Sequence, residues 1–78
     1  MFGIKRMWQI SSYQTYARSY IIKNYDFDIQ SLGTGRLFEY SEKIYDEEMK
    51  KFNRIRRTSD EIFTDLLIRK LISEGIII

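Results

Sequence analysis

The stretch from Thr58 to Gly75 constrains the fold of this chain most. Thr58 and Glu61 have the spacing of a capping box, in which each side chain accepts a hydrogen bond from the other residue's backbone amide. Apolar residues then recur at helical spacing, and Gly75 suits the left-handed conformation that ends many helices. We therefore expect a helix over about residues 59–74. Its apolar stripe comprises Ile62, Phe63, Leu66, Leu67, Leu71 and Ile72.

A second helix is expected just before this one, over residues 40–54. Apolar side chains again recur there at helical spacing. Asp46 precedes Lys50, and Glu47 precedes Lys51, by one helical turn, which is the favourable order for ion pairs on a helix face. Acidic residues come early and basic residues late in this segment, as the helix dipole favours.

The N-terminal half carries a different pattern. Tyr25, Phe27 and Ile29 alternate with polar residues, which is the two-residue period of a half-buried strand. Residues 31–35 contain two glycines and fit a turn, and residues 36–40 can return as a second strand. We therefore expect a β-hairpin in this part of the chain.

Residues 12–23 fit two structures. Their tyrosines recur at helical spacing, which favours a helix, but the tyrosine-rich and β-branched composition also suits a strand. A further strand fits residues 4–10. The expected fold class is therefore α+β: one small domain over residues 1–78, with an N-terminal β-hairpin-containing half followed by two C-terminal helices. The expected core consists of Trp8, Phe27, Ile29, Phe38, Ile44, Met49, Phe52, Ile62, Phe63, Leu66, Leu67 and Leu71.

The composition excludes several kinds of chemistry. The chain has no cysteine and no histidine, so the commonest zinc ligands and the commonest general base are missing. We therefore expect no metal, no cofactor and no enzymatic activity. No apolar run approaches the roughly 20 residues that cross a bilayer, and the lack of cysteine fits a cytoplasmic protein without membrane attachment.

Five basic residues are concentrated in residues 50–57, at the junction of the two expected helices, with no acid among them. Lysine and arginine at such a junction can contact nucleic-acid phosphates. A helix, a short turn, a capped helix and a strand after Gly75 together resemble the core of a winged helix–turn–helix. A small nucleic-acid-binding regulator of this kind is the alternative function, and its contact residues would be Lys50, Lys51, Arg54, Arg56 and Arg57.

This resemblance departs from the family in two respects. We expect no wing hairpin, since Gly75 is followed here by Ile76, Ile77 and Ile78. The exposed start of the expected recognition helix carries Asp60, Glu61 and Asp65, and their charges would oppose phosphate. Base readout is therefore disfavoured, and the net charge of +2 is mild.

The six tyrosines point instead to a protein interface, where tyrosine is enriched. We expect an exposed aromatic face on residues 13–20. The leading hypothesis is a small non-catalytic module that occupies a surface of a larger protein, as a phage or mobile-element inhibitor or adaptor would. Its predicted contacts are Tyr13, Tyr16, Arg18 and Tyr20, with Arg54, Arg56 and Arg57 for electrostatic steering.

The last three residues are all isoleucine, which is costly to leave in water at a free end. Ile76, Ile77 and Ile78 are expected to add an edge strand, to fill a groove, or to contact a second subunit. A homo-oligomer built through this tail is a third hypothesis.

Overall fold

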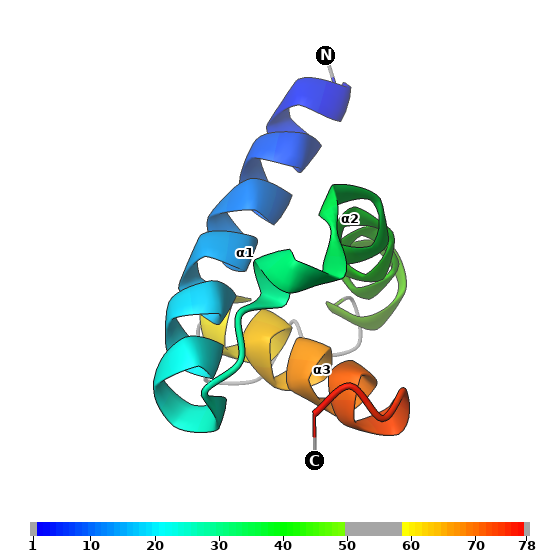
Figure 1. The fold of residues 1–78 in the computed structure, drawn as a ribbon. Coiled ribbons are helices and arrows are strands. Elements are labelled where there is room, and N and C mark those ends of the chain that lie inside the picture. The colour runs from blue at the N-terminus through cyan, green and yellow to red at the C-terminus, as the bar shows by residue number, and fades with distance from the viewer. Residues whose placement is uncertain (1, 50–58, 78) are drawn as a thin grey trace.

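The computed structural model describes the backbone of residues 2–49 and 59–77 and the side chains of residues 6–49 and 59–77. All regular elements in these residues are helical (Figure 1). The expectation of an α+β fold is therefore wrong, and the described part is an all-helical small domain. Its elements are α1 (Phe2–Tyr25), the 3-10 helix η1 (Ile29–Leu32), α2 (Thr34–Lys43), the π-helix η2 (Ile44–Glu48) and α3 (Ser59–Ser73).

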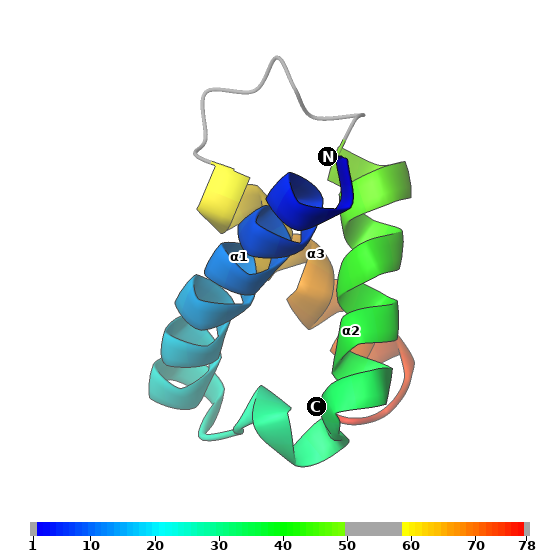
Figure 2. The same cartoon turned by 90° about the horizontal axis from the view of Figure 1, so that it is seen from above.

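The three α-helices pack around one core. Figure 2 shows α1 and α2 as two sides joined by η1, with η2 continuing α2 directly. Helix α3 crosses behind them and contacts α1, α2 and η2. No described helix is both long and apolar enough to span a membrane.

Helix α1 covers residues 12–23, where a helix was favoured, and also residues 4–10, where the expectation of a strand is wrong. Its buried residues Ile10, Ala17 and Ile21 are spaced by about two turns and one turn, so they lie on one helix face. That face meets Phe63, Leu67 and Leu71 of α3, all fully buried.

The predicted hairpin is replaced by the α1–η1–α2 connection. Helix α1 ends at Tyr25, and Asp26 adopts a left-handed backbone with φ of 54°. The Asp28 carboxylate accepts a hydrogen bond from the Gln30 amide at 3.0 Å and caps η1. Gly33, with φ of 91°, then leads into α2. Local capping therefore decides this segment, because the alternation of three apolar residues is too short to specify a strand.

Residues 36–40, the expected return strand, belong to α2. Leu37, Tyr40, Ser41 and Ile44 are buried at offsets of three, four and seven residues from Leu37, which is the spacing of one helix face. The second expected helix thus begins earlier than residue 40, and its residues 50–54 lie outside the described ones. In η2 the backbone has the hydrogen-bond spacing of a π-helix, which is five residues in place of the four of an α-helix. The Met49 amide, for example, donates to the Ile44 carbonyl.

The expected helix over residues 59–74 is confirmed by α3. Gly75 has φ of 73°, its amide donates to the Ile72 carbonyl at 3.0 Å, and the Ile76 amide donates to the Leu71 carbonyl at 2.9 Å. This pair of hydrogen bonds is a Schellman motif. Thr58, the expected cap at the other end, lies outside the described residues.

Isoleucines of the tail return to the protein's own core. Ile77 is 7% exposed, and Ile76 is partly buried against the same core cluster. The tail forms no strand in its described residues. Ile78 lies outside them.

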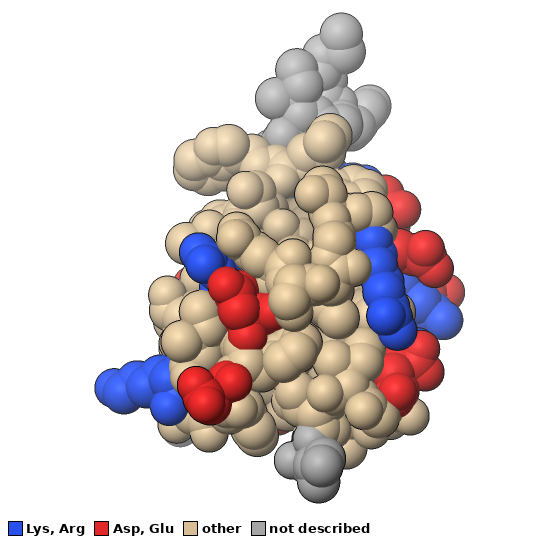
Figure 3. All heavy atoms as spheres, in the orientation of Figure 1, with Lys and Arg blue, Asp and Glu red and all other residues tan. Residues whose placement is uncertain are grey.

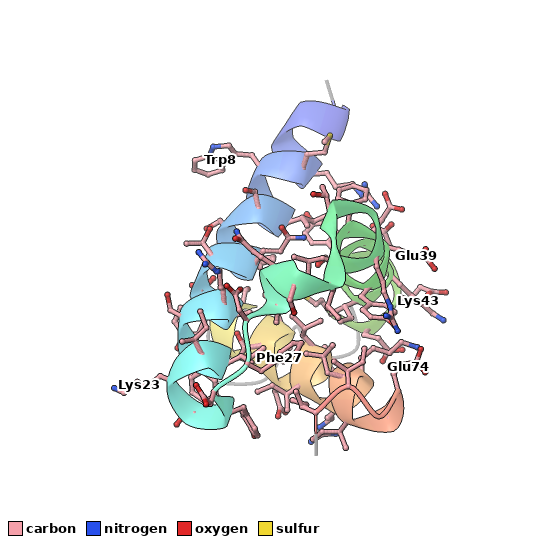
Figure 4. The ribbon with its side chains drawn as sticks, viewed as in Figure 1. Trp8, Lys23, Phe27, Glu39, Lys43 and Glu74 are labelled. Atoms are coloured by element: carbon pink, nitrogen blue, oxygen red, sulfur yellow. The ribbon has the colours of Figure 1, made fainter. Side chains whose placement is uncertain are left out.

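The core matches the expected one in its C-terminal part more than in its N-terminal part. Trp8 was expected inside but is 75% exposed, because it lies on the outer side of α1 and points away from the body of the protein (Figure 4). Phe38 is half-buried, and Phe52 lies outside the described residues. The expected residues Ile29, Ile44, Ile62, Phe63, Leu67 and Leu71 are buried, and Phe27, Met49 and Leu66 pack partly buried against the core.

Candidate functional site

The tyrosines of α1 divide between the core and the surface. The Tyr13 ring stacks on Phe63, with centroids 5.4 Å apart, and lies tilted against the Tyr45 ring, with centroids 6.1 Å apart. Tyr16 and Tyr20 are 40% and 43% exposed and follow each other by one helical turn. The structure therefore keeps Tyr16 and Tyr20 together on the surface and moves Tyr13 into packing contacts.

A hollow of about 140 Å³ lies between these tyrosines and α3, and we call it the tyrosine pocket. Tyr25, which is 41% exposed, completes the aromatic rim at the end of α1. The other lining residues belong to α3. They follow Glu61 at offsets of three, four and seven residues, so they lie on one stripe of that helix. The full lining is Tyr16, Tyr20, Tyr25, Glu61, Thr64, Asp65 and Ile68.

Thr64 lines this pocket and is 3% exposed. Its hydroxyl oxygen has no hydrogen-bond partner among the described residues. A buried hydroxyl without a partner costs free energy, because it has lost its hydrogen bonds to water. The pocket thus contains a polar group able to donate to, or accept from, a molecule that enters it.

The charge of the pocket lining is negative. Glu61 and Asp65 lie one helical turn apart on α3, and no lysine or arginine is among the described lining residues. Asp65 also pairs with Arg69 at 3.4 Å, but the Arg69 side chain is 72% exposed, so solvent screens this pair strongly.

Arg18 does not lie with the tyrosines. Its guanidinium donates from Nε to Asp28 Oδ1 at 2.9 Å and from Nη2 to Asp28 Oδ2 at 3.0 Å. This pairing raises the pKa of Arg18 and lowers that of Asp28, which also accepts from the Gln30 amide. Arg18 lines a separate hollow of about 230 Å³ beside η1, and its interaction is an internal tie between α1 and η1.

Two further sets of polar side-chain contacts connect α1 with α2 and with η2, which continues α2. Arg6 donates from Nε to Asp46 Oδ1 at 3.0 Å and contacts Glu42 at 3.0 Å. The hydrogen bonds chiefly to Asp46 and then to Glu42 raise the pKa of Arg6. The side chain of Gln14, which is half-buried, donates to the hydroxyl of the buried Ser41 at 2.8 Å.

The predicted basic contacts cannot be placed. Lys50, Lys51, Arg54, Arg56 and Arg57 all lie outside the described residues. On the face shown in Figure 3, basic and acidic groups lie next to each other, and no broad patch of one sign covers the coloured atoms. Within the described residues, no group of three or more acidic side chains is arranged to hold a metal ion.

Sequence reasoning missed most of the pocket. Tyr25 was assigned to a strand, and Thr64 was hidden between the apolar residues of α3. The available signal was the recurrence of Glu61, Asp65 and Ile68 at helical spacing, one step around α3 from its apolar stripe. That signal identifies a stripe on α3 but not the part of α1 that faces it.

Comparison with known proteins gave no match to a family model, to a curated protein or to a solved structure.

Proposed function

We propose that this protein is a small non-catalytic protein-binding module and that the tyrosine pocket is its contact surface. The supporting observation is the group of three tyrosines, each about two-fifths exposed, around a hollow that contains a buried hydroxyl without a described partner. Tyrosine gives a large and rigid contact area, and central interface residues usually fill or line pockets.

The module would act by occupying a surface of a larger protein, as an inhibitor or adaptor. The absence of histidine and cysteine supports binding in preference to catalysis. We place this binding in the cytoplasm, which the lack of cysteine supports. The steering role of Arg54, Arg56 and Arg57 stays a sequence prediction, as does the nucleic-acid alternative.

The homo-oligomer hypothesis receives no support from the described packing. Ile77, the central residue of the tail, is buried in the core of its own chain, and Ile76 packs beside it. These side chains are therefore already covered without a second subunit.

An affinity capture with matched variants tests the proposed function. Tagged protein is incubated with lysate of the organism that makes it, with and without nuclease, and captured proteins are quantified by mass spectrometry. We expect a nuclease-resistant partner that is lost with Tyr16→Ala and with Tyr20→Ala. The matched control is Trp8→Ala, because Trp8 is a larger and more exposed aromatic residue that points away from the body of the protein (Figure 4).

The tyrosine variants should keep the far-ultraviolet circular dichroism and unfolding midpoint of the wild type, because both side chains are exposed. Capture that survives both tyrosine substitutions, or that Trp8→Ala removes equally, would contradict the proposal. Capture that disappears with nuclease would favour the nucleic-acid alternative instead, and a gel shift that weakens steeply with salt would then be expected.

A further inference from the structure

We propose that a groove between α2 and α3 binds a free alkanoate, which is a single unbranched hydrocarbon chain that ends in a carboxylate. The groove has a volume of about 400 Å³, and we call it the α2–α3 groove. This second site is separate from the tyrosine pocket and independent of the proposed function. Its lining includes Tyr40, Lys43, Ile44, Leu66, Arg69 and Lys70.

The α2–α3 groove lies on a different side of α3 from the tyrosine pocket. Leu66 and Lys70, which line the groove, follow each other by one helical turn. The corresponding residues of the pocket are Thr64 and Ile68, each two positions earlier. Two residues turn an α-helix by more than half a revolution, so the two pairs face different ways. A molecule in the groove therefore does not occupy the tyrosine pocket.

The floor of the groove is apolar. Tyr40 and Ile44 are 8% and 5% exposed, and Leu66 packs partly buried against the core. The Tyr40 hydroxyl accepts from Arg36 Nε at 3.0 Å and donates to Glu74 Oε1 at 3.2 Å, so its hydrogen bonds are already made within the protein. Small-molecule sites are typically concave and mostly apolar, with volumes of about 300–1,000 Å³ and a few polar groups. The groove has the surface and the size that suit a hydrocarbon chain.

The rim of the groove is basic. Lys43 comes from α2 and Lys70 from α3, and within the described residues neither lysine has a carboxylate partner. The Lys70 ammonium lies 5.4 Å from the centroid of the Tyr40 ring, which keeps its charge close to the apolar floor. Arg69 adds a third positive charge, although it already pairs with Asp65. The two unpaired ammonium groups favour an anion at the rim.

An alkanoate is the class of ligand that uses both features. An inorganic anion would leave the apolar floor in water, and an uncharged hydrocarbon would leave the two lysines without a partner. A peptide would place backbone amides over Ile44 and Leu66, whose side chains have no polar atom to pair with them. A methylene chain has no such groups, and its burial is favourable over its whole length.

A titration of the full chain with four small amphiphiles, each below its critical micelle concentration, tests this inference. The probes are hexanoate, octanoate, octanol and octylammonium. Amide chemical shifts are followed by two-dimensional nitrogen–proton NMR. We expect saturable shift changes at Ile44, Leu66 and Lys70 with octanoate, and none with octylammonium. The Kd should fall by up to roughly fourfold for each methylene added between hexanoate and octanoate.

Charge variants then test the role of the two lysines. The double variant Lys43→Met/Lys70→Met keeps unbranched side chains but removes both charges, so it should raise the Kd of octanoate about tenfold and leave that of octanol unchanged. The matched control is Lys23→Met, because Lys23 is an exposed lysine of α1 that points away from the body of the protein (Figure 4). Tyr16→Ala should bind octanoate as the wild type does, since Tyr16 lines the other site.

Several results would overturn the inference. Equal binding of octanol and octanoate would mean an apolar site that does not recognise charge, and equal binding of hexanoate and octanoate would mean that the floor is not used. An equal effect of Lys23→Met would mean nonspecific charge attraction. Tighter binding of an end-blocked glutamyl-leucyl-glutamate peptide than of octanoate would mean an acidic protein ligand. Sedimentation with anionic phospholipid vesicles, without saturable binding of octanoate, would mean a membrane surface.

Discussion

Thr64 lies in an environment that suits an apolar side chain of the same shape better than a hydroxyl. It is 3% exposed, and its neighbours in sequence, Ile62 and Phe63, are buried as well. In the described part of the chain, its hydroxyl is the buried side-chain polar atom without a hydrogen-bond partner. The protein therefore keeps a group that lowers the stability of the free state, which is expected at a binding site.

Thr64→Val should raise the free energy of unfolding by about 1 kcal/mol, because it removes the unsatisfied hydroxyl and keeps the β-branched shape. Urea unfolding followed by circular dichroism measures the change. The matched control is Thr15→Val, whose hydroxyl donates to the Ser11 carbonyl at 3.0 Å on the exposed side of α1 and should give no gain. A loss of stability in Thr64→Val would contradict the absence of a partner.

The ionisation of Asp28 should make the stability of the folded protein depend on pH. Its pKa is lowered, first by the hydrogen bonds from Arg18 and then by that from the Gln30 amide. A carboxylate with a lowered pKa in the folded state adds stability above its unfolded pKa of about 3.9. That contribution is lost as the pH falls through the folded pKa. The wild type should therefore be more stable than Asp28→Asn at neutral pH, and the difference should shrink below about pH 4.

The measurement is the urea midpoint of both proteins between pH 7 and pH 2. Arg18→Ala serves as the control, because it removes the main cause of the lowered pKa. In the Arg18→Ala background, the Asp28→Asn substitution should show a smaller pH-dependent difference. A difference between wild type and Asp28→Asn that is constant with pH would count against the Arg18–Asp28 pair.

At the scale of the elements, the ends of the helices are specified locally. Two glycines differ in whether their backbone conformation requires glycine. Gly75 ends α3 with φ of 73°, a conformation that L side chains rarely adopt. Gly35 lies within the first turn of α2 with no positive φ, and an added Cβ there would meet no atom within 4 Å.

Gly75→Ala should lower the free energy of unfolding by about 1 kcal/mol, because alanine is strained in the left-handed region. Gly35→Ala should raise it by about 0.5 kcal/mol, because alanine loses less backbone entropy in a helix. Thermal unfolding of the two variants beside the wild type measures both effects. Equal changes of the same sign would mean that Gly75 does not form the Schellman motif.

At the scale of the whole molecule, the isoleucine tail closes the core. Ile77→Ala should lower the free energy of unfolding by about 2 kcal/mol, because it removes buried methyl groups. Ile72→Ala makes the same chemical change at a 47% exposed position and should have a much smaller effect. Light scattering should give the mass of one chain for the wild type and for both variants. A dimer that dissociates in Ile77→Ala would instead support the oligomer hypothesis.

Agreement between sequence and structure was highest where the information is local. The helix over residues 59–74 and its glycine cap follow from residues within a few positions of each other, and α3 ends as expected. The prediction of a hairpin was wrong because a two-residue period and a 3.6-residue period cannot be told apart over five residues. There, Asp28 as a cap and the Leu37–Ile44 stripe favoured helices.

The sequence predicted an exposed aromatic face on residues 13–20 but no pocket. Tyr16 and Tyr20 were expected at the surface and lie there, but Tyr13 packs on Phe63 and Arg18 pairs with Asp28. These four residues lie on one stretch of helix, so their spacing alone cannot tell which side meets α3. That choice depends on contacts between residues that are far apart in the sequence.

The sequence by itself determined that residues 59–73 form a helix, where that helix ends, and which chemical groups the chain can offer, because propensity, capping and composition act over a few residues. Tertiary structure alone decided that α1 turns Ala17 and Ile21 toward α3 and leaves Tyr16 and Tyr20 outside. It also brought Tyr25 of α1 and Thr64 of α3 into the lining of one pocket. The physical reason is that burial of apolar surface is a property of the packed assembly of helices, so it selects among helix faces that are equivalent in an isolated segment.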